Sequence, residues 1–545
     1  MEKLLAFLCR LGLAEREIIL VLLYTHRRLK FPFCATFCEP WCQAPTADGT
    51  GNFNAKYYKT PVLLNALRAV VRSSNGGRNG KFQREVLYNG KYHKSMKKIR
   101  MYQRYWGPLG GGQRFLAFIA QILSENNEVE ILHHAEDFDL KRFEEGMEVD
   151  LSRVQFRCVP RLERPQWTTN NPMKRLMQEA SLGREWSEGA DVFLESSDIP
   201  PVFNRSKHGI LLTHFPLIGF EEFCGHTLPE WGKQNVFKRL LKKQYQGLEW
   251  RCRFSSYHTY LCNSQFTRRW CFSRWGISPQ ILNPPLRSGI QPAEKIPLIL
   301  SMGAFSKENH KRQDILIHAF QNLCDMHPDI CPPKGLWNLR LIGPCKDNDE
   351  DRDFVERLRL KAQGYPIEIR TNVDGGELLE SLAKACFVWH AMGYGVDEQR
   401  NPGRTEHFGM VATEAQAAGA IPMVFHAGGL PEIVHHGRDG ILWSTIPELV
   451  KTTFNLIYDP EYVESMRENA LKNSTNYNDA AFRARLAHVL RGVVDVKETT
   501  GKNSGVKNGS MKKRCEKSRC GGFVWVARKF VENFHQFRPL SSCGY

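Results

Sequence analysis

The chain has 545 residues, enough for several domains of about 150 residues each with sizeable hydrophobic cores. Its net charge of +17 lies at the ends: residues 1–100 carry 18 basic and 6 acidic side chains, and residues 493–545 carry 11 and 4. The near-neutral body disfavours nucleic acid as a partner.

The longest early apolar run, residues 18–24, is too short to span a bilayer, which needs roughly 20 apolar residues. A signal peptide is not expected, because the charged residues 15–17 occupy the place where its cleavage site would have small residues.

The 16 cysteines are too few for a disulfide scaffold in a chain of this length. Three of them, in CATFCEPWC (34–42), recur every four residues, and without a fourth ligand they favour structural or incidental cysteines over a zinc site. Nine others occur singly through the middle, as reduced and buried thiols do. We therefore expect a reducing, cytoplasmic setting. The nine are Cys158, Cys224, Cys252, Cys262, Cys271, Cys324, Cys331, Cys345 and Cys386.

The first elements with a clear pattern begin at Lys98. Residues 1–97 have no steady hydrophobic period, so we treat them as a basic extension without an assigned fold. A strand over 98–106, a glycine turn, a helix over 113–125 and a strand over 129–134 then form a βαβ unit, which predicts a parallel sheet. Further strands complete one α/β domain over 98–285. We expect them at 154–159, 190–196, 209–215 and 259–264.

A second α/β series follows the proline-bearing segment 283–295. We predict a second domain over 286–475, a closing helix over 476–492 and a disordered basic tail over 493–545. The predicted fold class is thus α/β, with two doubly wound, Rossmann-like domains facing a cleft where ligands bind. The strands expected in the second domain are 297–303, 339–345, 367–372, 386–392 and 420–426.

The segment EHFGMVATEAQAAG, residues 406–419, carries the strongest chemical signal. Its Phe-Gly pair leads into a run of good helix formers that a glycine ends. The first amides of a helix bind anions, so a phosphate would meet the backbone around Gly409 and Met410. Glu406 and Glu414 are eight positions apart. Carboxylates accept hydrogen bonds from sugar and ribose hydroxyls, so we predict that both flank one hydroxyl-rich ligand.

This E-x7-E segment resembles the signature of glycosyltransferase family 4, the mannosyltransferase-like group 1 glycosyltransferases. Other segments follow in the order that the family shows: GPLGGGQRFL, DLSRVQFRCVP, LLTHFP, CNSQFTRRW, HKRQDILIHAF and GGLPEIV. The similarity covers residues 98–492 and implies a GT-B fold and a retaining enzyme that uses a nucleotide sugar. It implies transfer of a hexose to a hydroxyl of a glycan or lipid-linked glycan, with mannose from GDP-mannose as one candidate donor.

The resemblance also assigns residues of the second domain to the donor. Glu406 would contact the donor sugar beside the reacting carbon, and Glu414 would hold the ribose. Gly428 and Gly429 resemble the loop at the nucleotide end of the donor, with a simple strand-to-helix turn as the alternative. For the two glutamates, the alternative is a pair of surface carboxylates at a helix start. The residues expected to line the diphosphate are His407, Phe408, Gly409 and Met410.

A lysine of the same domain is expected to be catalytic. Lys311 stands where the family places a lysine that neutralises the donor phosphates, and a positive charge there would stabilise the leaving diphosphate. A solvated lysine at a helix start is the alternative. The family's companion arginine, directly after the strand glycine, is replaced here by Ala304. Either Lys307 or Arg312 supplies the second charge, or donor binding is weaker.

The first domain offers a glycine turn and a histidine. Gly110, Gly111 and Gly112 let the backbone approach a ligand closely, and the resemblance implies contact with donor phosphate or acceptor. Their spacing differs from the dinucleotide pattern, which disfavours NAD. His214 ends a strand where the family has a histidine near the acceptor and donor sugar, a catalytic position. A plain tight turn and a packed histidine are the structural alternatives.

Neither a metal nor a cofactor is expected. The acidic cluster KDNDEDRD (346–353) lies among charged residues and predicts a solvated loop, and no DxD-type pair stands between apolar strands. Lys311 and helix dipoles would then neutralise the departing nucleoside diphosphate while an acceptor hydroxyl attacks from the same face.

The helix expected at 231–246 has apolar residues toward one side and basic residues toward the other, as in helices that lie on anionic lipid surfaces. An ordinary basic surface helix is the alternative. We expect a protein of the cytoplasm or of the cytosolic face of a membrane. Two other hypotheses stay open: a catalytically idle sugar-nucleotide-binding protein, consistent with Ala304, and a basic nucleic-acid-binding protein that uses the terminal charge.

Overall fold

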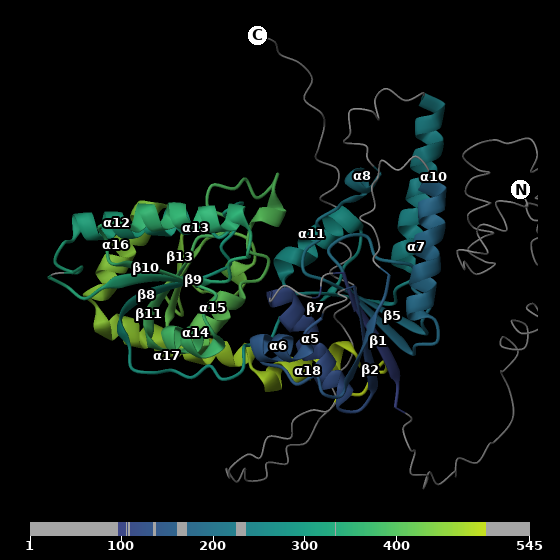
Figure 1. Ribbon diagram of the computed structural model, residues 1–545, viewed down its shortest axis with the longest axis horizontal. Coiled ribbons are helices and arrows are strands. Elements are labelled where there is room, and N and C mark those ends of the chain that lie inside the picture. Colours follow the sequence, from purple (N-terminus) through teal and green to yellow (C-terminus); the bar gives the residue numbers. More distant parts are fainter. Residues whose placement is uncertain are drawn as a thin grey trace, which may run out of the picture. The chain divides into compact units, whose positions relative to one another are not determined.

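The computed structural model describes residues 96–104, 106, 110–134, 138–160, 172–224, 236–332 and 334–496. The N-terminal extension with its CATFCEPWC segment and the tail beyond residue 496 lie outside the described residues. The described residues form two parallel sheets, each with helices on both faces (Figure 1).

The first sheet has seven strands in the order β3-β2-β1-β4-β5-β6-β7, and every neighbouring pair is parallel. Side chains alternate between its faces, as the pleat requires: Ile99 and Met101 belong to one hydrophobic cluster and Tyr102 to another. The strands are β1 (Lys98–Gln103), β2 (Glu128–His133), β3 (Val154–Cys158), β4 (Val192–Ser196), β5 (His208–Thr213), β6 (Thr259–Cys262) and β7 (Gln280–Ile281).

Two sets of helices cover this sheet. Helices α5 (Gly111–Ser124) and α6 (Leu140–Met147) bury apolar side chains in the cluster of Ile99, with Phe115 and Ile119 fully buried. The opposite cluster combines aromatic side chains of the strands, such as Phe193, with those of the other helices, including Trp186 and Trp250. These helices are α7 (Pro172–Ser187), α8 (Phe220–Phe223), α10 (Val236–Ser255) and α11 (Gln265–Trp275).

The second sheet has six parallel strands in the order β10-β9-β8-β11-β12-β13. Helices α12 (Gln313–Met326), α13 (Asp349–Ala362) and α16 (Ile446–Ile457) share one core cluster, and α14 (Gly375–Lys384) and α15 (Met410–Ala417) contribute to the cluster on the other face (Figure 1). Helix α17 (Pro460–Ser474) follows α16. The strands are β8 (Ile296–Met302), β9 (Asn338–Gly343), β10 (Ile367–Thr371), β11 (Ala385–His390), β12 (Ile421–Phe425) and β13 (Ile441–Trp443).

The last helix, α18 (Asp479–Val489), packs in the core of the first sheet although it follows the second in the chain. The ring of Phe482 lies 5.5 Å from that of Phe118 on α5, centre to centre. Arg483 forms an ion pair of 2.7 Å with Glu125, just after α5. The chain therefore returns to its first sheet after completing the second.

The predicted fold class is confirmed: each sheet has the strand order of a doubly wound α/β domain. A strand lies within or across every range where the sequence predicted one. Strands β7 and β13 were not expected, because two or three residues are too few to show a period. Helix α12 begins at Gln313, two residues later than the expected start at Lys311.

The prediction that the nine central cysteines are all reduced and buried is wrong. Cys324 and Cys331 form a disulfide, because the chain turns back after α12 and brings their Cα atoms to 5.8 Å. Cys158 is exposed. Cysteine usage therefore no longer supports a reducing compartment.

The predicted basic helix at 231–246 is observed from Val236, and it continues to Ser255 as α10. Most side chains of its first two turns lie outside the described residues, so the two-faced pattern stays a prediction. None of the helices in the described part of the chain has both the length and the apolar character needed to cross a bilayer.

Candidate functional site

The central residues of the site come from two loops that the topology places side by side. Strands β8 and β11 pair in the middle of the second sheet, although the β9 and β10 units separate them in the chain. Ligands of doubly wound sheets bind at the carboxyl ends of the strands where the order reverses, which here is between β8 and β11. The loop after β8 carries Lys311, and the loop after β11 carries Glu406.

The Glu406 carboxylate has two side-chain partners. Its Oε2 accepts a hydrogen bond of 2.7 Å from Lys311 Nζ and one of 3.1 Å from His390 Nε2. Lys311 Nζ also lies 3.3 Å from Met392 Sδ. The side chains of Lys311 and Glu406 are 27% and 18% exposed, whereas that of His390 is 3% exposed. Two functional residues predicted from sequence thus contact each other, together with a histidine that was not predicted.

Burial and neighbouring charges determine the protonation states of Glu406 and His390. Burial by itself would raise the pKa of Glu406, but the Lys311 charge and the His390 hydrogen bond outweigh it and hold that pKa well below its usual value. Burial lowers the pKa of His390. At neutral pH the group therefore consists of an ionised carboxylate, a neutral imidazole and a lysine beside the carboxylate.

The residues after Glu406 lead the backbone through a tight turn into α15. Gly409, the residue before the helix, has a φ of 111°, and a Cβ there would lie 2.5 Å from Leu430 Cδ2. Only glycine fits this conformation and this space. Phe408 is buried beside Leu430 and Tyr477. The amides of Met410 and Val411 come before the first intrahelical hydrogen bond and are available to an anion, whereas the Ala412 amide donates to the Gly409 carbonyl at 3.0 Å.

The two glycines of the GGLPEIV segment pack directly against the Glu406 loop. A Cβ on Gly428 would lie 2.1 Å from the Glu406 carbonyl oxygen, and a Cβ on Gly429 would lie 2.4 Å from that of His407. The Gly429 amide donates to the Glu406 carbonyl at 2.8 Å. Glycine at both positions therefore allows this segment to pack closely against the backbone of the loop that carries Glu406.

Glu414 has a partner from the first sheet's helix α5. Its Oε1 accepts a hydrogen bond of 2.6 Å from Arg114 Nη2, and both side chains are less than a tenth exposed. Arg114 was not predicted as a site residue. The signal was present as the arginine two positions after the glycine turn, in GGGQRF.

His214 lies beside the glycine turn, a contact that the sequence did not predict. Its Nε2 is 3.1 Å from Ser196 Oγ, and a Cβ on Gly112 would lie 3.1 Å from that nitrogen. A Cβ on Gly111 would lie 2.9 Å from Met410 Sδ, whereas Gly110 faces the side chain of the nearby Gln113. The glycines thus leave room for groups of both sheets.

His407 is held by residues of the first sheet's loops. Its ring stacks on Phe215 with the centres 4.3 Å apart, and its carbonyl accepts a hydrogen bond of 2.6 Å from Ser264 Oγ. Burial lowers the pKa of His407. Glu432, in the GGLPEIV segment, accepts from the Gln265 amide at 2.7 Å, at the start of α11.

The two candidates for a second cation have partners elsewhere. Lys307 forms an exposed ion pair with Glu350. Arg312 adopts a left-handed backbone conformation and donates from Nη1 to the Tyr394 carbonyl at 2.6 Å. The carbonyl of Ala304 accepts from the side-chain amide of Gln313 at 3.1 Å. Lys311 is thus the cation that contacts Glu406.

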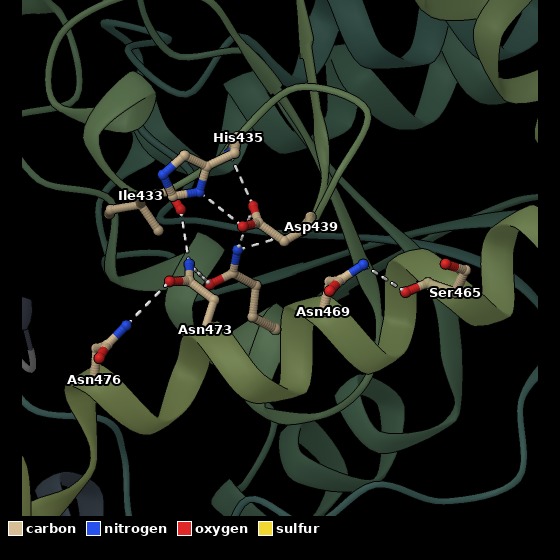
Figure 2. Close-up of polar contacts among 8 residues, drawn as sticks. Ile433, His435, Asp439, Ser465, Asn469, Asn473 and Asn476 are labelled. Carbon is tan, nitrogen blue, oxygen red and sulfur yellow. Dashed lines mark hydrogen bonds and ion pairs between the residues drawn. The ribbon is translucent and has the colours of Figure 1, made fainter.

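A polar network fixes the loop that follows the GGLPEIV segment (Figure 2). Asp439 is fully buried and accepts from His435 Nδ1 at 2.7 Å and from the His435 amide at 2.8 Å. Gln416, on α15, donates to Asp439 Oδ1 at 3.3 Å. Asn473, on α17, donates to the Ile433 carbonyl at 2.9 Å and to Gln416 Oε1 at 3.0 Å. The network ties this loop to α15, the helix that carries Glu414.

Within the described ranges, no group of three or more His, Cys, Asp or Glu side chains gathers as a metal ion would need. The acidic residues 347, 349 and 350 are instead occupied by ion pairs with Arg352 and Lys307.

Comparison with known proteins gives a family match over the second sheet and its helices, and relatives that match part of the chain. The family model described as "Glycosyl transferases group 1" matches residues 285–473. A GDP-Man:Man(3)GlcNAc(2)-PP-Dol alpha-1,2-mannosyltransferase of Dictyostelium discoideum is 27% identical over 217 residues, which are 38% of this chain and 40% of that protein. The Homo sapiens protein of the same description is 27% identical over 243 residues, 41% of this chain and 46% of that protein. The chain thus matches less than half the length of these relatives.

A solved structure supports the fold over a longer range. The sucrose-phosphate synthase of Thermosynechococcus elongatus has a TM-score of 0.50 and 13% identity, and the match covers 72% of this chain and 98% of that one. At this identity the likeness concerns the fold alone. The range of the family match includes Lys311, Glu406 and Glu414. Residues 285–473 are therefore similar to the group 1 glycosyltransferases, the family that the motifs of the sequence resemble.

Proposed function

We propose that this chain transfers a mannosyl group from GDP-mannose to a hydroxyl of a mannose-containing glycan linked to a lipid diphosphate. One observation carries the proposal: the region that matches the group 1 glycosyltransferases contains a part-buried carboxylate, Glu406, in contact with Lys311. Relatives of the chain are described as GDP-Man-dependent mannosyltransferases.

The proposed donor site is built from the second sheet. Glu406 accepts hydrogen bonds from hydroxyls of the mannose, because an ionised carboxylate can only accept. Lys311 has three donors, of which one is used by Glu406, and the others stabilise the negative charge that builds up on the departing diphosphate. The backbone amides of His407, Phe408, Gly409 and Met410 bind the same diphosphate at the start of α15.

The nucleoside lies further along α15 in this proposal. Glu414 accepts from the ribose hydroxyls, with Arg114 holding its other oxygen, and the loop of Gly428 and Gly429 faces the nucleotide. Arg312, next to Lys311, adds positive charge near the phosphates.

The acceptor approaches from the first sheet. His214 and the turn of Gly110, Gly111 and Gly112 lie on that side, next to Met410. We propose a retaining reaction without a metal ion: the nucleoside diphosphate leaves, and the acceptor hydroxyl attacks from the same face while the leaving phosphate accepts its proton. A lipid-linked acceptor would bring the enzyme to the cytosolic face of a membrane, the contact predicted for residues 231–246.

The test is a transfer assay with the full chain. GDP-mannose labelled in the sugar is incubated with a trimannosyl glycan on a synthetic lipid diphosphate, and UDP-glucose and UDP-N-acetylglucosamine serve as alternative donors. We expect one added mannose from GDP-mannose only, removable by an α-1,2-specific mannosidase and formed equally in the presence of a chelator. Glu406→Ala should abolish transfer. Transfer from another donor alone would refute the proposed substrate.

A second candidate, a sugar-nucleotide-binding protein without transferase activity, is favoured by Ala304 at the position of the usual arginine. The same assay separates the two. A binding protein would show a higher melting temperature with GDP-mannose but no product with any acceptor, because binding to the folded state alone raises that temperature.

A further inference from the structure

We infer that His390 is a positioning residue that orients the Glu406 carboxylate toward the donor sugar, an inference that rests on the proposed function. His390 is the last residue of β11, and Glu406 follows it by 16 positions across the loop. No sequence motif pointed to this histidine. The contact lies wholly within the second sheet and its loops, so it does not depend on the first domain.

The direction of the hydrogen bond follows from the charges. Glu406 is ionised beside Lys311 and can only accept, so His390 Nε2 must carry the hydrogen of the 3.1 Å bond. A neutral imidazole then has an unprotonated Nδ1, and this atom is buried without a hydrogen-bond partner among the described residues. A buried acceptor without a partner is costly. The observed orientation of the His390 ring therefore makes the hydrogen bond to Glu406 and leaves the second ring nitrogen without one.

The two partners of Glu406 differ in what they can do when the donor binds. Lys311 is long and partly exposed, and its ammonium is free to turn toward a phosphate. His390 is short and 3% exposed, on the end of a central strand. Its hydrogen bond is therefore the fixed one. It holds the carboxylate in place while Lys311 divides its donors between Glu406 and the diphosphate.

The alternative is that His390 is only a well-packed core side chain. Its neighbour Trp389 is fully buried, and β11 is the central strand of the sheet, so a loss of packing could also lower activity. A conservative set of variants separates the two roles. His390→Phe keeps the ring and removes the donor, whereas His390→Gln keeps an N–H at the position of Nε2 and removes the ring. His390→Asn keeps an amide that is too short to reach.

The experiment measures kcat and KM for GDP-mannose in the transfer assay with the full chain. We expect His390→Phe to lower kcat about 10- to 100-fold, because a misplaced catalytic group loses about that much rate, and to change KM less than kcat. His390→Gln should restore most of the rate, and His390→Asn should not.

The outcomes separate this inference from the proposed function. If the wild-type chain transfers no mannose, the proposed function fails and the inference fails with it. If the wild-type chain is active and His390→Phe is equally active, the inference alone fails. It also fails if His390→Phe and His390→Gln are impaired alike, which indicates packing. If His390→Phe does not fold, the comparison of the Gln and Asn variants decides, because only Gln reaches Glu406.

Discussion

Replacement of Lys311 by Met tests the electrostatics of the site without a substrate. Methionine has nearly the length of lysine and can remain beside Met392, so the variant removes the charge and keeps most of the packing. It leaves the Glu406 carboxylate with the His390 hydrogen bond as its remaining side-chain contact. We expect the domain to become less stable at neutral pH.

The magnitude follows from the burial of the pair. Removal of one partner of a fully buried pair costs about 3–5 kcal/mol, whereas exposed pairs contribute about 0–1 kcal/mol. Lys311 and Glu406 are 27% and 18% exposed, which places the pair between these limits. Because His390 keeps one hydrogen bond to the carboxylate, we expect a loss of about 1–3 kcal/mol in the free energy of unfolding.

The pH dependence of this loss has a definite sign. In the folded chain the pKa of Glu406 lies below the ordinary value of 4.5, so its ionised form stabilises the fold at neutral pH. That contribution disappears as the pH falls below about 4.5 toward the depressed folded value. Removal of Lys311 takes away two of the causes that lower the pKa of Glu406, so this pKa rises from its value in the folded wild type. The difference between wild type and Lys311→Met should therefore be largest at pH 7 and shrink on acidification.

Urea unfolding at pH 7 and near pH 4 measures both quantities. Lys307→Met is the matched control, because Lys307 belongs to the same loop but pairs with Glu350 at the surface, and we expect no measurable change. An equal loss at the two pH values, or a Lys311→Met variant as stable as wild type at pH 7, would contradict the reasoning.

Other predictions concern the loops and the disulfide. Gly428→Ala should lower the melting temperature and the transfer rate, whereas Gly189→Ala, which has a similar positive φ but nothing near its Cβ, should report the backbone strain alone, about 1 kcal/mol. Arg114→Met should destabilise the chain by about 2–4 kcal/mol in urea unfolding, because it leaves the carboxylate on α15 buried without its cation. Cys324→Ser should lower the melting temperature and make it insensitive to reductant, since the bridge to Cys331 closes a short loop worth about 2 kcal/mol; an unchanged melting temperature would show that the bridge does not form.

The elements of this fold are largely predictable from local patterns. Apolar runs bounded by turns located β1 and β8, and helical spacing located α5. The same patterns failed for β13, which is three residues long, and for the disulfide, which depends on a turn after α12 that brings two cysteines together.

The candidate site likewise has one part that local sequence patterns predict and another that only the tertiary structure decides. The sequence by itself determined that Glu406, Lys311 and the glycines are present at the ends of strands and helices, because residue type and spacing are local properties. Only the tertiary structure decided that Lys311, His390 and Glu406 meet, since their contact depends on β8 pairing with β11 while β9 and β10 lie on the other side of β8. Strand order is set by packing over the whole sheet, and no local spacing records it.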